Sequence, residues 1–395
     1  MSRRLRPVAA RQATLLVGIC LIAGSLSGCS QRDSQQQSRR VTPFVFQVLN
    51  LSQQDAQGRL LWQVTSPEAR YDLSRRLALA RQLRGEIHAN GQALYRLQAS
   101  HGTVLRDGEV IQLEGDVTVE RLGAEPVTIQ ASRMRWYPRQ QRLELDRHAQ
   151  AQDRTLKLTA AKATLLLDRD LLQLRGQPLL QTRQGLGGAM GLLRVQLRQI
   201  DWAPGSGRLS ALGPVLASSR GHSGGSRNLS AAGLEGNTAT RRLTLLAPVR
   251  LEAPDQGAWL QAQTSSVDLS NSTVASTAGF SAAVGPLRIS GQGLRLNLAS
   301  SNAEILSGCS LVQPDAALSA QRCRWNWQSD LVSASGDVEL RRQANRQTTR
   351  AQELRGRVGA AGLLEFSSPG SRVRSTLVLP PPRSDAKTRA AATRL

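Results

Sequence analysis

The sequence of 395 residues has few aromatic residues, few cysteines and no long apolar run. Phe, Trp and Tyr together make up only 3% of it, and no basic helix or aromatic-interleaved patch is present. This composition argues against a nucleic-acid-binding protein. The apolar stretch near the N-terminus, from Ala13 to Gly24, is too short for the ~20 apolar residues of a membrane-spanning helix.

The residue patterns of enzymes and metal sites are missing as well. There is no Cys-x-x-Cys spacing or Cys/His cluster of the kind that binds zinc. The histidines stand apart from any set of nucleophile, base and acid, and the carboxylates mostly occupy outward or turn positions, where a glycosidase pair is not expected. The sequence therefore predicts a protein that is not an enzyme and needs no metal or cofactor. The four histidines are His88, His101, His148 and His222.

Two cysteines, Cys309 and Cys323, remain outside the N-terminal segment. They flank a short turn-rich stretch, Gln313-Pro314-Asp315, so a hairpin would bring them close together. In an oxidising compartment they could form one disulfide. Two buried thiols are an equally acceptable interpretation of the sequence.

The N-terminus has the organisation of a secretory signal. Four arginines precede the apolar stretch, which is followed by Leu26-Ser27-Gly28-Cys29. We interpret residues 1–28 as a signal peptide and Cys29 as the lipidated first residue of a bacterial lipoprotein. An ordinary signal peptide or a short uncleaved anchor are the alternatives, and all three export the chain. The composition of residues 29–40, rich in Gln and Ser, predicts a flexible tether.

The chain carries a formal net charge of +22, almost entirely from arginine. A guanidinium group suits phosphate or carboxylate, so a partner with negative charge is expected. Arginine bias can also come from genome composition, and the scattered positions are typical of a solvated face. At the C-terminus, Pro380-Pro381-Pro382 ends the predicted folded region, and the basic tail 380–395 should be disordered.

Alternation with period two dominates the body of the chain and predicts a nearly all-β protein. In residues 111–119 the odd positions are apolar or Gly and the even positions are polar. A repeat adds to this: an anchor residue is followed eleven residues later by Gly or Ala, as in Val104 to Gly115, Trp202 to Gly213 and Trp325 to Gly336. We interpret each unit as a hairpin with Gly on the inward face of its second strand. Such bends would curl antiparallel sheets into an open β-jelly roll with repeated hairpin units, although generic β-sandwich packing gives the same periodicity.

Glycine-rich stretches suggest a division of the body. The run from Gly185 to Gly191 and the Gly/Ser loop near 218–226 interrupt the strand pattern. We place one boundary near 185, which gives a first β region at 41–184 and a second, repeated β region at 185–379.

Residues 44–120 resemble the periplasmic domain of LptC and the related OstA-like jelly rolls. The features that carry the resemblance are Gln54-Asp55, Gly58, Trp62, Ser66, Ala69, Tyr71-Asp72, Asn90-Gly91, Tyr95, Ala99, Gly102, Asp107-Gly108, Leu113, Gly115 and Val117. The resemblance implies a β-jelly roll whose apolar interior holds lipid acyl chains. Candidate lining residues are Ile111, Leu113, Val117, Val119, Trp62, Tyr95 and Trp136, all of which could equally be plain core.

The resemblance also implies a function and partners. It implies a periplasmic component that receives lipopolysaccharide from an inner-membrane ABC transporter, with proteins resembling LptF and LptG and the ATPase LptB. It would pass the lipid to an LptA-like bridge protein. It also implies the periplasm of a Gram-negative-type bacterium. The family often has an uncleaved transmembrane helix where this chain has the Leu26-Ser27-Gly28-Cys29 sequence, so we expect a lipid anchor instead, with the inner membrane favoured over the outer. A non-catalytic envelope scaffold or a glycan-binding β-sandwich lipoprotein is the alternative.

Overall fold

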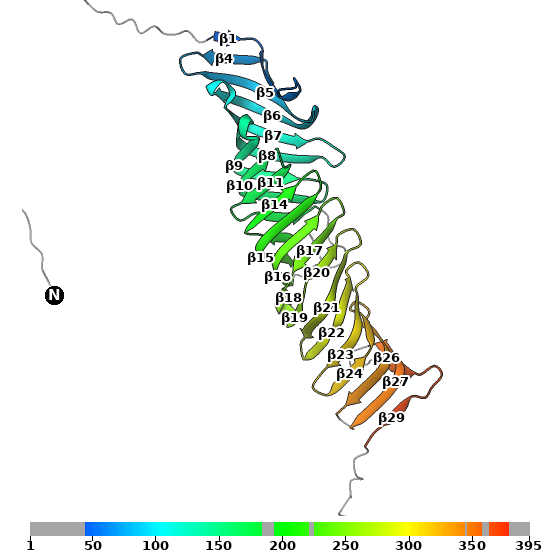
Figure 1. Cartoon of the computed structure of the whole chain (residues 1–395). Helices are drawn as coiled ribbons and strands as arrows, with labels where there is room; N and C mark the ends of the chain where they lie inside the picture. The colour runs from blue at the N-terminus through cyan, green and yellow to red at the C-terminus, as the bar shows by residue number, and fades with distance from the viewer. Residues whose placement is uncertain (1–43, 184–192, 221–224, 344–345, 358–362, 379–395) are drawn as a thin grey trace, which may run out of the picture. The chain divides into compact units, whose positions relative to one another are not determined.

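Period-two alternation in the sequence becomes a ladder of antiparallel strands in the computed structural model, which describes residues 44–183, 193–220, 225–343, 346–357 and 363–378. The predicted signal peptide, Cys29, the tether, the boundary near 185 and the whole of the tail 380–395 lie outside the described residues. The prediction of a nearly all-β protein is confirmed (Figure 1).

The strands follow one another in chain order along the ladder. The first ten are β1 Phe44–Phe46, β2 Leu49–Gln54, β3 Leu60–Ser66, β4 Glu68–Asp72, β5 Leu77–Ala89, β6 Gln92–Leu105, β7 Val110–Arg121, β8 Val127–Tyr137, β9 Arg142–Gln152 and β10 Leu156–Leu166. The next ten are β11 Leu171–Arg175, β12 Leu179–Thr182, β13 Arg194–Gln196, β14 Gln199–Ala203, β15 Arg208–Arg220, β16 Ser226–Asn237, β17 Arg242–Leu246, β18 Val249–Ala253, β19 Ala258–Ala262 and β20 Ser265–Asp268. The remaining strands are β21 Thr273–Val284, β22 Leu287–Asn297, β23 Asn302–Val312, β24 Ala316–Ala320, β25 Arg322–Asn326, β26 Leu331–Arg342, β27 Gln347–Arg357, β28 Leu364–Ser367 and β29 Arg374–Thr376. Three short 3-10 helices lie in turns: η1 Arg106–Gly108, η2 Pro138–Gln140 and η3 Pro254–Gln256.

The ladder is folded into two layers because its long strands bend near their middle. One half of β10 pairs with β11 and the other half with β12, and β23 is shared in the same way between β25 and β24. We call layer A the side that contains β3, β12, β13, β18, β19, β24 and β29, and layer B the side that contains β4, β11, β14, β17, β20, β25 and β28. Pairs β12 with β13 and β11 with β14 continue both layers across residues 184–192.

The bends lie at the positions that the repeat singled out. The pairing register shifts between Glu114 and Val117, and Gly115 there has a φ of +74°. Gly213 and Gly336 also have positive φ, at +93° and +77°, a backbone conformation that L side chains rarely adopt. The predicted hairpins are present, but these glycines are half-exposed at the bends and do not face inward, because a bulged residue leaves the alternation of the strand.

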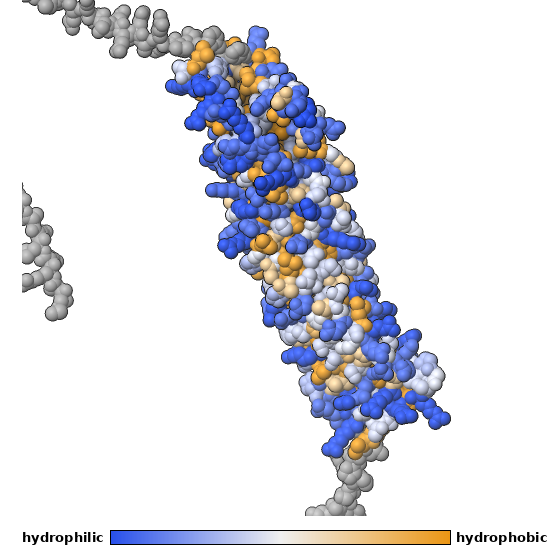
Figure 2. All heavy atoms as spheres, in the orientation of Figure 1, coloured by the Kyte–Doolittle hydropathy of each residue, from blue (hydrophilic) through white to orange (hydrophobic). Residues whose placement is uncertain are grey.

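The hairpin turns lie at the other ends of the strand halves, away from the bends. We call the space between the turns of layer A and those of layer B the mouth. Buried apolar side chains line the interior between the layers in two clusters, one from Trp62 to Leu298 and one from Ala262 to Leu354. On the face shown in Figure 2, hydrophilic side chains dominate and apolar ones form smaller patches between them.

Within the described residues, the structure contains no helix with the length and apolar character needed to cross a membrane.

Candidate functional site: an apolar cavity between the layers

The residues predicted to line a lipid-holding interior are all buried between the layers. Ile111, Leu113 and Val119 are 0% exposed and Val117 is 1% exposed, whereas Glu114 on the opposite face is exposed. This confirms the inward direction that the alternation predicted for Ile111, Leu113, Val117 and Val119, but not for Gly115, which lies at the bend. The aromatic candidates Trp62, Tyr95 and Trp136 are buried as well. Lining of a lipid site remains a prediction for all seven, because in this structure they are packed core.

The first half of the interior is filled, and an aromatic pair helps to close it. Trp62 of layer A meets Trp136 of layer B edge to face, with ring centroids 5.2 Å apart. The largest fully buried side chains of the described residues all lie between Leu83 and Trp202. Close packing of this kind leaves no room for a ligand unless the layers separate.

The second half of the interior is hollow. An apolar cavity of 290 Å³ lies between the layers and reaches from the bends to the mouth. Layer A contributes residues of β18, β19, β21, β22 and β23, and layer B contributes residues of β22, β23, β25 and β26. The residues that line it include Leu251, Leu260, Phe280, Ile289, Leu294, Leu296, Ile305, Leu311, Trp325, Trp327 and Val332. A smaller apolar cavity of 100 Å³ adjoins it and shares Leu251, Leu260 and Leu296.

The cavity forms because small side chains occupy several inward positions. Ala253, Ala258 and Ala282 of layer A and Ala303 of layer B line it, opposite larger side chains that do not fill the space. Each missing methylene removes volume that the opposite layer does not fill. The alternation of apolar residues is thus maintained while the interior stays open.

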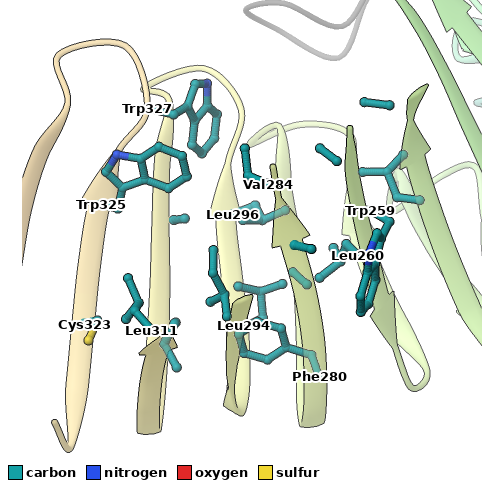
Figure 3. A pocket seen from close by; sticks show the side chains of 18 of the residues that line it. Trp259, Leu260, Phe280, Val284, Leu294, Leu296, Leu311, Cys323, Trp325 and Trp327 are labelled. Atoms are coloured by element: carbon teal, nitrogen blue, oxygen red, sulfur yellow. The ribbon is translucent and has the colours of Figure 1, made fainter. Parts of the chain in front are cut away.

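The two ends of the cavity differ in character. Trp325 and Trp327 lie at one end, and Cys323, Phe280 and Leu294 at the other (Figure 3). Trp327 belongs to a hairpin turn and Val284 is 39% exposed, so apolar surface reaches the mouth. Arg227 is among the lining residues, whereas the Arg324 side chain is 65% exposed on the outer face, where it donates to Glu304 over 3.1 Å.

A disulfide closes the inner end of the cavity. Cys309 of layer A and Cys323 of layer B are bonded, with their Cα atoms 5.9 Å apart, and both are buried. Cys309 directly follows the bend residue Gly308, so the bond joins the two layers next to the fold line. Of the two interpretations that the sequence left open, the structure has the disulfide.

The cavity residues were not among the predicted site residues. Their signal was present in the alternation at Leu294, Leu296 and Leu298 and in the repeat anchor Trp325, but core and cavity linings have the same pattern. Only the alanines across the interior distinguish them, and which alanine faces which leucine depends on the pairing of the layers. In the part of the chain that the structure describes, no group of His, Cys, Asp and Glu could hold a metal ion.

The geometry defines a class: an antiparallel, two-layered β-jelly roll with an apolar cavity between its layers. The model of the family described as lipopolysaccharide-assembly, LptC-related, matches residues 13–177. That region is therefore similar to the LptC-related family, in agreement with the resemblance over 44–120. The match covers less than half of the chain and ends before the cavity.

The chain is similar to LptH, the LptA-homologous periplasmic component of the conserved lipopolysaccharide transport device of Pseudomonas aeruginosa. The sequence identity is 15%, the similarity covers 29% of this chain and 82% of that one, and the TM-score is 0.26. No curated protein matches the sequence.

Proposed function

We propose that this protein is a periplasmic component of lipopolysaccharide transport that holds the acyl chains of the lipid between its two β layers. The observation that carries the proposal is the apolar cavity, in a chain whose first part is LptC-related. No chemistry is required of such a protein, because an amphiphile moves when its acyl chains exchange one apolar lining for another.

The lining of the cavity suits an anionic amphiphile. Each methylene removed from water contributes about 0.8 kcal/mol, so an acyl chain packed against Leu294, Leu296 and Phe280 would be held firmly. The guanidinium group of Arg227 suits a phosphate group of a lipid head group near the mouth. Exposed apolar surface at Val284 offers a path between cavity and solvent.

The proposal extends to the direction of transfer. The protein would receive lipopolysaccharide from an inner-membrane ABC transporter with subunits resembling LptF, LptG and LptB, and would deliver it to an LptA-like bridge. Export through the signal peptide 1–28 and lipidation of Cys29 would hold it at a membrane, the inner one by resemblance. Mass analysis of the mature protein tests the anchor: a mature chain that starts elsewhere and carries no acyl group would refute it.

A cavity-filling variant tests the proposed lipid site. Ala303→Phe places a ring in the space between the layers, so we expect it to abolish most lipopolysaccharide binding by the purified full chain. Ala275→Phe is the matched control, because Ala275 lies between the inward residues Val274 and Ser276 on the opposite face of β21.

Binding would be measured by displacement of a fluorescent acyl probe, with circular dichroism as a check that both variants are folded. Loss of binding in Ala303→Phe alone supports the proposal. Equal binding by wild type and Ala303→Phe would show that the cavity is not the lipid-binding site.

A further inference from the structure

A buried polar cluster joins the two layers across the mouth in the first half of the protein. The Tyr95 hydroxyl and the Arg121 guanidinium come from layer A, and both donate to the carboxylate of Asp170, which lies in the layer B turn between β10 and β11. Arg121 Nε lies 2.9 Å from Oδ2 and 3.2 Å from Oδ1 of Asp170. Asp170 is 49 residues from Arg121 and 75 residues from Tyr95 in sequence, so the cluster is a tertiary contact.

The cluster is sheltered from solvent, which strengthens it. The side chains of Arg121 and Asp170 are 16% and 24% exposed, and Tyr95 is 0% exposed. Burial and the neighbouring Asp170 carboxylate raise the pKa of the Tyr95 hydroxyl, which therefore keeps its proton and donates it. Charge-assisted hydrogen bonds in such surroundings are stronger than neutral ones at the surface.

Other ion pairs nearby do not have this geometry. Arg175 and Asp201 lie 2.7 Å apart, but β11 and β14 are neighbouring strands of layer B. Arg133 and Asp146 likewise join the adjacent strands β8 and β9. Only a contact between the layers can resist their separation, so the Asp170 cluster acts on the mouth and these pairs do not.

Gly205 shows how closely the cluster is enclosed. It lies in the turn between β14 and β15, and a Cβ atom at this position would collide with Asp170 Oδ2 and Arg121 Nη2. Any side chain at position 205 must displace the Asp170 and Arg121 side chains. Unlike a substitution of Asp170, it does so without removing a charge from the cluster. Substitution of Asp170 and substitution of Gly205 are therefore two independent ways to disturb the same contact between the layers.

We propose that Tyr95, Arg121 and Asp170 form a latch that holds the mouth shut over the first half of the interior, and that its release admits acyl chains to the space lined by Val119. The second part of this statement rests on the proposed function. The latch accounts for an interior that is closed in the LptC-related region and open beyond it. It makes entry into the first half a gated step.

Hydrogen exchange of the full chain tests the latch without any lipid. In Asp170→Asn and in Gly205→Ala, we expect amides of residues 119–121 and 171–173 to exchange at least about tenfold faster, the factor expected when charge-assisted hydrogen bonds are lost. Asp201→Asn is the isosteric control, which breaks the Arg175 pair within layer B and should leave these amides unchanged. Unchanged exchange in both latch variants would overturn the proposal.

A second measurement separates the latch from the function. With a photo-crosslinking residue at Val119, Asp170→Asn should raise capture of lipopolysaccharide several-fold, while capture from Leu296 in the cavity should stay the same. Faster exchange with no capture at either position would support the latch and refute lipid transport. Normal capture at Leu296 with no rise at Val119 would refute the gating role and leave the proposed function intact.

Discussion

At the residue scale, the protein depends on which face of a strand each side chain occupies. Leu113 is 0% exposed and packs inside the first half of the interior. The adjacent Gln112 donates a side-chain hydrogen bond to Glu114 at the surface. Adjacent residues in one strand therefore have opposite environments. The consequence can be tested by substitution at neighbouring positions.

We expect Leu113→Ala to lower the free energy of unfolding by about 2–5 kcal/mol, because it removes buried methyl groups and leaves a cavity. Gln112→Ala should change it by less than about 0.5 kcal/mol, as surface substitutions usually do. Urea unfolding of both variants measures the difference. Similar midpoints for the two would contradict the assigned direction of β7.

Residue patterns predicted burial well but not the cavity. Alternation is a property of one strand, so the inward direction of Ile111, Leu113, Val117 and Val119 followed from the sequence. A cavity is a property of two layers, because it requires a small side chain such as Ala303 to face others that do not fill the gap. Pairing between residues far apart in sequence decides that, and no single strand contains the information.

At the element scale, the bends turn a ladder of hairpins into two layers. The repeat predicted the hairpins and the special positions within them, but it did not predict that the glycines leave the inner face. Arg147 lies eleven residues after Trp136, at the position that glycine takes in the other units, and it too has a positive φ, of +58°. The bend position of these units therefore has a positive φ whether glycine or arginine occupies it, and glycine only lowers the free-energy cost of that backbone conformation.

Two glycines with nearly the same backbone allow a matched test of the bends. Gly336 has a φ of +77° and a Cβ there would lie 2.5 Å from the Gln321 side chain, whereas Gly58 has a φ of +75° and open space. Gly58→Ala should cost about 1–2 kcal/mol from left-handed strain alone. Gly336→Ala should cost more, because the Gln321 side chain, which donates a hydrogen bond to Asp337, must also shift. Chemical denaturation measures both, and equal costs would show that the bend has room for a side chain.

At the scale of the whole molecule, each layer ends in strands that pair on one side only among the described residues. β1 pairs with β4 and β2 with β3 at the first end, while β28 and β29 both pair with β27 at the last. Unpaired backbone groups at such edges accept strands from other chains. By the proposed function, the first edge meets the transporter and the last edge meets the bridge protein.

Deletion of residues 371–379 removes β29 and should abolish the complex with the bridge protein while the contact with the transporter persists. Pull-down from cells with the full chain as reference measures both contacts. If every complex survives the deletion, the last edge is not the bridge contact.

The central claim is that lipid acyl chains occupy the interior between the layers, and site-specific photo-crosslinking in cells that export lipopolysaccharide tests it most directly. Crosslinking residues at Ile289 and Leu296 face the cavity, and those at Ser290 and Arg295 face outward on the same strand. In the first half, Leu113 and Val119 are compared with Gln112 and Thr118. The account predicts ATP-dependent capture of lipopolysaccharide from the inward positions only, strongest in the cavity. Equal capture from both faces, or none from any position during active export, would contradict it.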